Sequence, residues 1–324
     1  MKNPNFQMID TNGIRLRAVV EGEGPLVLMV HGFPESWYSW RHQIGPIAAA
    51  GFTACAIDVR GYGGSDKPPA VEDYAMEHML ADLVGVAKAL GGGKPATIIG
   101  HDWGAPQAHY CALRHPDVFG ALGTLSVPFV GIFEPGLIAM QNQYLESGDF
   151  FYQNHFQEPG VAEAEMEADI RTALRKFYFA LSGESDNDHL IGARPHGAPL
   201  LDVIPDPDPF PAWWTEEDID YVVGEFERSG LRGPLNRYRN LERDLQFMEP
   251  YLDKVLEQPS LFVGGAKDVV LKFAPPGVDM LDVMREMTTD LRVCELLPTV
   301  GHWTQQERPE LVTPLIVDWL KGLA

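Results

Sequence analysis

The sequence predicts an α/β protein: a mostly parallel sheet flanked by helices, with an inserted helical domain. Short apolar runs alternate with helix-forming stretches towards both ends of the chain, which is typical of a parallel sheet with helices on both faces. This alternation stops between residues 134 and 244. With 324 residues, the chain also exceeds the size at which a single hydrophobic core continues to grow. We therefore expect a core domain formed by residues 1–133 and 245–324, and a cap domain formed by residues 134–244.

The N-terminal part supplies the first elements of the expected core. Asn12-Gly13 between two short runs predicts a hairpin with a type I′ turn. Continuous apolar runs at residues 26–30 and 53–57 predict strands that are buried on both faces, with helical character between them at residues 35–50. Apolar residues at helical spacing predict a helix over residues 74–90. The next expected elements are a strand at residues 96–99, a helix that ends at His115, and a strand at residues 121–126.

The middle of the chain has a different pattern. It contains helical segments at residues 161–181 and 216–229 but no convincing buried strand, and a proline-rich loop at residues 195–211. An insertion of this kind usually covers the site at the carboxyl ends of the strands. The alternation then resumes with a strand at residues 260–264, a helix near residues 278–287, a strand at residues 293–297 and a final helix at residues 309–323.

Composition and charge exclude several classes of partner. The 46 acidic residues outnumber the 25 Lys and Arg residues, and a net charge of −21 argues against binding to nucleic acid or an anionic membrane. The longest uncharged run, residues 118–133, is too short to span a bilayer. The cysteines Cys55, Cys111 and Cys294 form no C-x-x-C pair, which fits free thiols in a reducing compartment. Because no signal-peptide pattern follows Met1, we expect a cytoplasmic protein, either a monomer or a homodimer.

The most informative motif is Gly-His-Asp-Trp-Gly at residues 100–104, between a β-branched run and a helix-forming stretch. It has the spacing of the nucleophile elbow G-x-S-x-G, a sharp strand-to-helix turn that exposes its middle side chain. The glycines fit a turn that leaves no room for a Cβ atom. The middle residue here is Asp102 rather than serine, which excludes a serine-type esterase. A carboxylate nucleophile attacks carbon and leaves an ester, so the sequence predicts alkyl transfer rather than acyl transfer.

An ester on Asp102 needs a base that activates water for its hydrolysis. In this architecture the acid and the histidine follow the nucleophile along the chain. His302 lies in the loop after the last expected strand and is the predicted base. Asp268 lies just past the preceding strand and can orient the imidazole. His101, beside the nucleophile, is expected to support the elbow by hydrogen bonding.

The attacked carboxylate also needs backbone donors, because negative charge develops on its carbonyl oxygen. The amide of Trp103, directly after the nucleophile, is one expected donor. The second is expected from the loop after the strand at residues 26–30, at the amide of Phe33. Pro34 predicts a fixed, cis peptide that shapes this loop.

Several other conspicuous groups are expected to be structural. Asp58 and Arg60 are expected to form an ion pair beneath the site. The acidic residues between 202 and 208 do not follow a Ca²⁺-loop pattern and are expected to be solvated. Trp213-Trp214 fits the core or a pocket lining better than a cofactor site. We therefore expect neither a metal nor a cofactor.

The cap can supply an acid if the substrate is an epoxide. An epoxide opens readily only when its oxygen is hydrogen-bonded as it becomes an alkoxide, and tyrosine is a suitable donor because it is protonated at neutral pH. Two cap segments that contain tyrosine are the candidates, at residues 150–160 and 230–240.

Taken together, these motifs resemble those of the soluble epoxide hydrolases of the α/β-hydrolase superfamily, of the bacterial type without an N-terminal phosphatase domain. The resemblance extends from about residue 8 to residue 320 and includes the cap. The motifs that carry it are HGFP at residues 31–34, DVRGYGGS at 58–65, GHDWG at 100–104, FQEPGVAEAE at 156–165, GPLN at 233–236 with YRN at 238–240, and GHWTQ at 301–305.

The resemblance implies an α/β-hydrolase fold and an enzyme that converts a small-molecule epoxide to a vicinal diol through an ester on Asp102. Water activated by the pair His302 and Asp268 would hydrolyse this ester, without a cofactor or a metal. One departure is Arg237, where the family commonly has tryptophan, which can alter the packing and the pKa of Tyr238. The other implied site residues are Tyr152 and Tyr238 as ring-opening acids, and Phe33 and Trp103 as oxyanion donors.

Two alternatives use the same fold. A haloalkane dehalogenase shares the carboxylate nucleophile, the histidine and their chain order, but it needs halide-stabilising donors and usually has Asn or Glu where Phe33 stands. A non-catalytic ligand receptor would keep the fold as a pocket. Such proteins often lose a catalytic position, whereas every expected position is filled here. The epoxide hydrolase therefore remains the preferred prediction.

Overall fold

An eight-stranded sheet forms the centre of the protein, which a computed structural model describes for residues 4–185 and 190–323. Neighbouring strands are parallel except where β2 pairs with β1 and with β4, so the predicted mostly parallel sheet is confirmed. The strand order is β1 (Phe6–Thr11), β2 (Ile14–Glu21), β4 (Thr53–Ile57), β3 (Leu26–Val30), β5 (Ala96–His101), β6 (Phe119–Leu125), β9 (Ser260–Gly265) and β10 (Leu291–Leu297).

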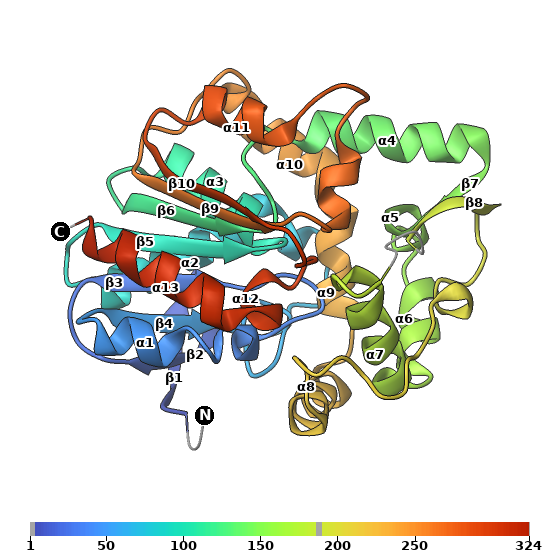
Figure 1. Ribbon diagram of the computed structural model, residues 1–324, viewed down its shortest axis with the longest axis horizontal. Coiled ribbons are helices and arrows are strands. Elements are labelled where there is room, and N and C mark those ends of the chain that lie inside the picture. Colours follow the sequence, from blue (N-terminus) through green and yellow to red (C-terminus); the bar gives the residue numbers. More distant parts are fainter. Residues whose placement is uncertain (1–3, 186–189, 324) are drawn as a thin grey trace.

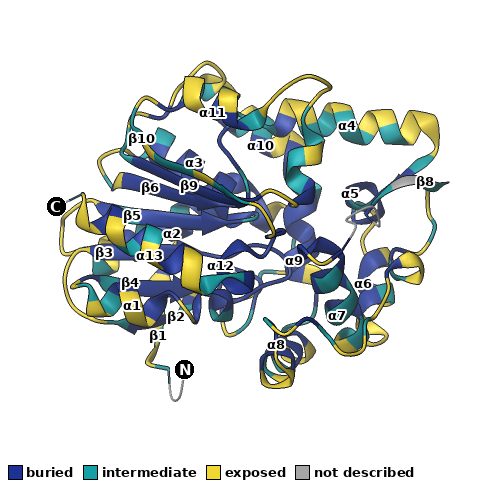
Figure 2. Cartoon of the chain, viewed as in Figure 1, coloured by how far each residue is buried: buried dark blue, intermediate teal, exposed yellow. Residues whose placement is uncertain are grey.

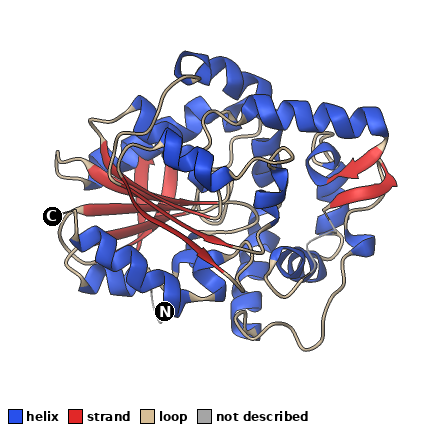
Figure 3. Cartoon of the chain, turned by 45° about the horizontal axis from the view of Figure 1, so that its top comes forward, coloured by secondary structure: helices blue, strands red, loops and turns tan. Residues whose placement is uncertain are grey.

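Helices cover both faces of this sheet (Figures 1 and 3). α2 (Met76–Leu90) and α3 (Gly104–Arg114) pack on one face, and α1 (Ile44–Ala49) and α13 (Pro309–Lys321) pack on the other. Successive residues of β3 point to opposite faces, as a strand requires: Leu28 joins the first cluster and Met29 the second. The central strands are therefore buried on both sides, whereas the edge strands β1 and β10 are partly exposed (Figure 2).

The core elements follow the sequence predictions closely. Each predicted core strand is present, and its ends differ from the prediction by two residues or fewer. Asn12 and Gly13 both have positive φ angles, 45° and 77°, which confirms the type I′ turn. The predicted helix at residues 35–50 is wrong in part: a 3₁₀ turn at Trp37–Trp40 and α1 replace it. The Ser36 hydroxyl accepts the Tyr38 N–H (3.2 Å) and starts this separate turn.

Most of the chain between β6 and β9 forms the right-hand part of Figure 1, whereas its last helix, α10, lies beside the core. The predicted cap boundary at residue 244 falls within the last helix of this segment, α10. Its elements are α4 (Glu134–Ser147), β7 (Asp149–Phe151), α5 (Tyr152–His155), α6 (Val161–Glu167), α7 (Ile170–Leu181), β8 (Ile191–Pro195), α8 (Glu216–Ser229), α9 (Arg232–Asn236) and α10 (Leu241–Met248).

Two predictions for this segment are wrong. The expected single helix at residues 161–181 is two helices, α6 and α7. The reason is Asp169, whose carboxylate accepts the Thr172 N–H (3.1 Å) and caps a new helix. The segment also contains strands, since β7 and β8 form an antiparallel pair. β7 has only three residues, too few to give an alternating pattern in the sequence.

The predicted ion pair between Asp58 and Arg60 is also wrong. Arg17 Nε donates to Asp58 Oδ2 (2.5 Å), and Arg60 Nε donates to Asp82 Oδ2 (2.6 Å). β2 runs antiparallel beside β4, and this register brings Arg17 next to the residue that follows β4. Arg60 lies past the end of that strand and faces α2 instead.

No helix in the part of the chain that the structure describes could span a membrane. Within residues 4–185 and 190–323, every helix is too short or too polar to cross a bilayer.

Candidate active site

Asp102 occupies a strained turn between β5 and α3. Its φ angle is 50°, in the left-handed region that a non-glycine residue rarely adopts. A Cβ atom at Gly100 would lie 2.0 Å from the Gly104 carbonyl oxygen, and one at Gly104 would lie 2.1 Å from the Val30 oxygen. A Cβ atom at Gly32 would lie 2.2 Å from Asp102 Oδ1. The turn therefore leaves no room for side chains on its flanks, as its motif predicts.

The structure brings Asp102, Asp268 and His302 together. They lie after β5, β9 and β10, at the carboxyl ends of three parallel strands. His302 Nε2 is 3.2 Å from Asp102 Oδ2, and His302 Nδ1 is 3.1 Å from both carboxylate oxygens of Asp268. Because a carboxylate can only accept, Nδ1–H donates to Asp268 and this fixes the orientation of the ring. The predicted base thus links the predicted nucleophile to the predicted acid.

Ser126 completes this group, and the sequence did not point to it. It follows β6, is fully buried and has a positive φ angle of 72°. Its hydroxyl donates to Asp268 Oδ2 (2.5 Å), and its oxygen lies 2.8 Å from His302 Nδ1. A lone serine at the end of a strand gives no signal in the sequence, since only the order of strands in the sheet shows what it touches.

A second network of buried hydrogen bonds is formed by His101, which directly precedes Asp102 in the elbow. His101 Nδ1 lies 2.7 Å from Glu35 Oε2, and His101 Nε2 lies 2.7 Å from the backbone oxygen of His302. The prediction that His101 supports the elbow is therefore confirmed. Glu35 was not anticipated; it also accepts the Gly32 N–H (2.8 Å) and the Gln306 amide (3.1 Å). This network connects the loops that follow β3, β5 and β10.

One oxyanion donor is already in contact with the nucleophile. The Phe33 amide donates to Asp102 Oδ1 at 2.7 Å. The peptide between Phe33 and Pro34 is cis, as predicted. Trp103 is the N-cap residue of α3, next to Asp102, where backbone N–H groups have no partner within the helix. Its donation to the carboxylate stays a prediction.

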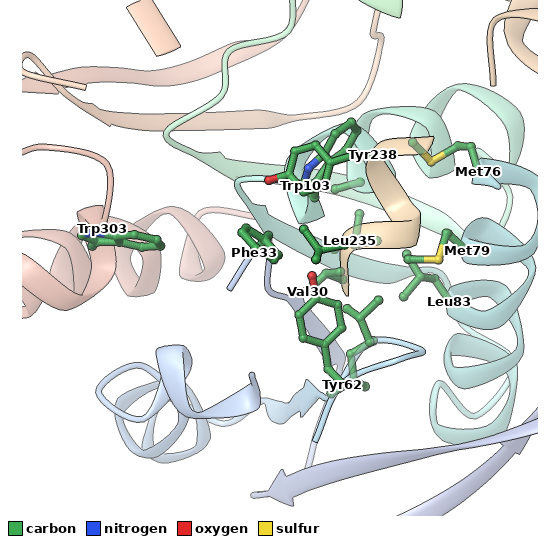
Figure 4. Close-up of a cluster of buried hydrophobic side chains, with 14 of the residues drawn as sticks. Val30, Phe33, Tyr62, Met76, Met79, Leu83, Trp103, Leu235, Tyr238 and Trp303 are labelled. Atoms are coloured by element: carbon green, nitrogen blue, oxygen red, sulfur yellow. The ribbon is translucent and has the colours of Figure 1, made fainter. Parts of the chain in front are cut away.

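The two candidate tyrosines approach the elbow from the inserted segment. Tyr152 begins α5, and Tyr238 lies in the 3₁₀ turn Arg237–Asn240. Their ring centroids are 6.2 Å apart. The Tyr238 ring packs edge-on against Trp103 (5.1 Å) and Phe33 (5.3 Å), and the first of these contacts can be followed in Figure 4. The Tyr152 hydroxyl accepts a hydrogen bond from Gln153 Nε2 (3.0 Å).

Arg237 is fully buried beside this cluster. Its guanidinium lies 4.8 Å from the centre of the Trp103 ring, on which Tyr238 also packs. It donates to the Asp244 carboxylate and to the Tyr74 carbonyl. Burial lowers the pKa of Arg237 to about 10, so it is cationic at neutral pH. The residue that departs from the family pattern therefore joins the inserted segment to the core.

The charges in the site stabilise one another. Burial would raise the pKa of Asp102, but the hydrogen bond and the charge of His302 outweigh it and hold this pKa below its usual value. Burial would lower the pKa of His302, but the charges of Asp268 and Asp102 raise it well above the ordinary value. Burial raises the pKa of Tyr152 and Tyr238, and the charge of Asp102 adds to this effect. Both tyrosines are therefore protonated donors at neutral pH.

A cavity of about 560 Å³ opens onto the nucleophile. Asp102 and Tyr152 both line it. The rest of its wall is mostly apolar and comes from the loop after β6, from α4 and from residues 270–280. A small molecule in this cavity can reach the carboxylate, whose side chain is 18% exposed.

Comparisons with known proteins show the family and the fold of this chain. Residues 25–167 match the family described as the alpha/beta hydrolase fold. The chain is 39% identical to "Epoxide hydrolase A" of Mycobacterium tuberculosis, over 100% of this chain and 99% of that protein. It is also similar to a solved epoxide hydrolase from an endophytic Streptomyces (45% identity, TM-score 0.92, 100% and 97% of the two chains). Epoxide Hydrolase A from Mycobacterium thermoresistibile is a further structural relative (40% identity, TM-score 0.90, 99% of each chain).

Proposed function

The chain belongs to the epoxide hydrolases of the α/β-hydrolase superfamily, and from that premise we propose how its own residues convert an epoxide to a vicinal diol. The observation that carries the proposal is the position of His302, in contact with both Asp102 and Asp268. This geometry suits a carboxylate nucleophile and a base that later activates water to hydrolyse the ester on that carboxylate.

In the first half-reaction, Asp102 Oδ2 attacks an epoxide carbon. A bond forms between that carbon and Oδ2, and the carbon–oxygen bond of the ring breaks. The electron pair passes to the epoxide oxygen, which takes a proton from the hydroxyl of Tyr152 or Tyr238. Asp102 Oδ1 stays on the Phe33 amide, which already holds it at 2.7 Å.

In the second half-reaction, neutral His302 removes a proton from water, and the resulting hydroxide attacks the Asp102 carbonyl carbon. The amides of Phe33 and Trp103 stabilise the charge on Oδ1. The bond between the carbonyl carbon and Oδ2 then breaks, and the departing Oδ2 takes a proton from the His302 imidazolium. The diol leaves with Oδ2, Asp102 keeps the oxygen of water, and the proton of the new carboxylic acid returns to the tyrosinate. Esterification removes the charge of Asp102, one of the causes that raise the pKa of His302. The ester thus favours the neutral imidazole that the base requires.

Ser126 acts in this scheme as a positioning residue. Its hydroxyl donates to Asp268 and its oxygen accepts from His302 Nδ1–H, so it fixes the two groups relative to each other. We also propose that residues 134–244 form a cap that presents both tyrosines to the site. We further propose a cytoplasmic location, which the three free cysteines support. A monomer or a homodimer is compatible with a site whose proposed residues all come from one chain.

Two variants test the proposal by intact-protein mass spectrometry. His302→Gln is expected to accumulate the alkyl-enzyme ester, because the base is lost, whereas Asp102→Ala is expected to form none. In a single turnover in heavy-oxygen water, the wild-type label should enter Asp102 and not the diol. Label in the diol alone, or halide release from a haloalkane without epoxide turnover, would contradict the proposed mechanism.

A further inference from the structure

The cavity at Asp102 is elongated towards α3 and α4. From the nucleophile it follows one face of α3, where Trp103, Pro106 and His109 recur every three residues. It continues beneath Leu137 and Met140 of α4. Its lining then reaches exposed residues at the surface, namely Gln143, Lys272, Pro275 and Pro276.

Five buried aromatic rings that do not line this cavity pack around the loops of Pro34 and His302, and we call them the aromatic wall: Phe33, Phe177, Tyr178, Trp214 and Trp303. Each of them is 2% exposed or less. The Tyr178 ring is stacked between Trp303 (4.2 Å) and Trp214 (4.0 Å). Its hydroxyl donates to the Pro34 carbonyl (3.0 Å). Among the described residues, no member of α7 or of α12 (Thr304–Glu307) lines the cavity.

The aromatic wall lies directly against the reacting groups. The Trp303 ring is 4.9 Å from the His302 ring, and the Phe33 ring is 5.3 Å from the Tyr238 ring. Phe33 also supplies the amide that holds Asp102. A substituent that leaves the epoxide on this side would therefore collide with close-packed rings, which cannot be displaced without cost.

We propose that this enzyme prefers epoxides that carry one extended apolar substituent, which runs from Asp102 along α3 and α4 to the surface, over trans epoxides substituted at both carbons. The proposal rests on the proposed function, in that it takes Asp102 as the nucleophile. It assigns the preference to two features: the elongated cavity accepts the substituent, and the aromatic wall excludes a second one.

The charge distribution of the cavity supports an apolar substituent. Among the residues that line it, only Asp102 and Lys272 carry a full charge, and they lie at its two ends. His109 lies between them, and burial lowers the pKa of His109 to about 3, so its imidazole is neutral. An ionised group in the middle of the substituent would lose its hydration without gaining a partner.

The test uses two isomers with the same number of carbons, 1,2-epoxyoctane and trans-4,5-epoxyoctane. The wild-type enzyme is expected to have a kcat/KM at least about tenfold higher for the terminal isomer, since exclusion of a single methylene group changes kcat/KM by about 10-fold or more. A terminal carbon is also intrinsically easier to attack. Variants on each side of Asp102 therefore separate the shape of the site from the chemistry of the substrate.

Leu137→Trp narrows the cavity from α4. It is expected to lower kcat/KM for 1,2-epoxyoctane about tenfold more than for 1,2-epoxypropane, because the short substrate does not reach α4. Leu145→Trp is the matched control: Leu145 lies on the same helix, is 50% exposed and does not line the cavity. Its ratio for the two substrates should equal that of the wild type.

Tyr178→Ala opens the aromatic wall and is expected to raise kcat/KM for trans-4,5-epoxyoctane relative to 1,2-epoxyoctane. If this variant does not fold, the comparison of Leu137→Trp with Leu145→Trp still tests whether the substituent extends along α4. Equal kcat/KM for both isomers, together with no chain-length effect of Leu137→Trp, would overturn the proposed preference but leave the function intact. Absence of any ester with either isomer in His302→Gln would instead overturn the role of Asp102.

Discussion

The core and the cap hold their reacting groups in different ways. In the core, Asp102, Asp268, Ser126 and His302 are joined by hydrogen bonds between loops that follow four strands of the sheet. In the cap, the proposed acids are held mainly by their rings, as Tyr238 is by Phe33 and Trp103. A buried charge is costly unless it is paired, whereas a neutral phenol can be held by apolar contacts. The cap can thus hold a phenol by ring contacts, and the Tyr152 hydroxyl, which accepts from Gln153 Nε2, keeps its own proton to donate.

The largest effect is expected when both hydroxyls are removed and both rings are kept. In Tyr152→Phe with Tyr238→Phe, ester formation should fall about 10⁴-fold, and in each single variant about 10²-fold, because no donor or only one donor meets the developing alkoxide. The rate is measured as ester formation in the His302→Gln background.

Tyr144→Phe is the control, since it removes a hydroxyl from α4 at a residue that does not line the cavity. Normal ester formation in the double variant would remove both tyrosines from the mechanism.

The same difference between core and cap decides what could be predicted from sequence. The elbow, Asp268 and His302 follow from a motif and a chain order, because parallel strands bring their carboxyl ends to one edge. The elbow glycines are required by contacts within the motif itself. Ser126 carries no such local requirement. Its role depends on β6 lying between β5 and β9, which no short segment of the sequence reveals.

The elements between β6 and β9 were harder to predict in detail. The roles of Tyr152 and Tyr238 as ring-opening acids were implied by the family resemblance and not by the spacing of these residues in the sequence. The helical periodicity of residues 161–181 is continuous, so the N-cap at Asp169 was overlooked although its partner Thr172 is only three residues away. The pairing of β7 with β8 joins residues about forty positions apart, and such short strands depend on tertiary contacts rather than on local pattern.

A buried ion pair of the cap, Arg237 with Asp244, contacts the core at Tyr74 and Met76 and gives the next largest effect. Arg237→Met leaves the Asp244 carboxylate buried without its cation, so the free energy of unfolding should fall by about 3–5 kcal/mol. Adding Asp244→Asn should restore much of this loss. It removes the charge and keeps an oxygen that can accept the Met76 N–H, which Asp244 Oδ1 now accepts (2.7 Å). The measurement is chemical denaturation.

Arg228→Met is the control for this prediction, because Arg228 pairs with Glu225 at a side chain that is 66% exposed. Its effect should stay within about 1 kcal/mol. An equal loss in Arg228→Met and Arg237→Met would show that the buried pair contributes no more to the free energy of unfolding than the exposed pair.

A smaller and more selective effect is expected at Ser126. Ser126→Ala should slow ester hydrolysis about tenfold, the order of one lost hydrogen bond to charged groups, and slow ester formation less. The ester should therefore accumulate in the steady state, which quenched-flow mass spectrometry detects. Ser126→Asn should recover part of the rate, because asparagine tolerates a positive φ angle and its amide can donate to Asp268. If both half-reactions slow equally, Ser126 is structural and does not position the base.

The smallest expected effect is a change in the pKa of His302, and it tests how the two half-reactions are coupled. The charges of Asp268 and Asp102 both raise this pKa, and Asp268 contributes more. Removing an anion beside an imidazole lowers its pKa. Asp268→Asn and Asp102→Asn should therefore each lower it, with the larger change in Asp268→Asn. NMR titration of ring-labelled histidine measures the pKa, and the signal that is lost in His302→Gln identifies the residue.

Asp290→Asn, at an exposed pair with Arg292, should leave the pKa of His302 unchanged and serves as the control. Asp102→Asn has the charge that Asp102 has in the ester, so a lower pKa in this variant means that alkylation itself makes His302 a neutral base. The acid limb of ester hydrolysis would then lie at a lower pH than the titration of His302 in the free enzyme. An unchanged pKa in Asp102→Asn would mean that the charge of Asp102 does not affect the pKa of His302. Alkylation would then not favour the neutral imidazole that ester hydrolysis requires.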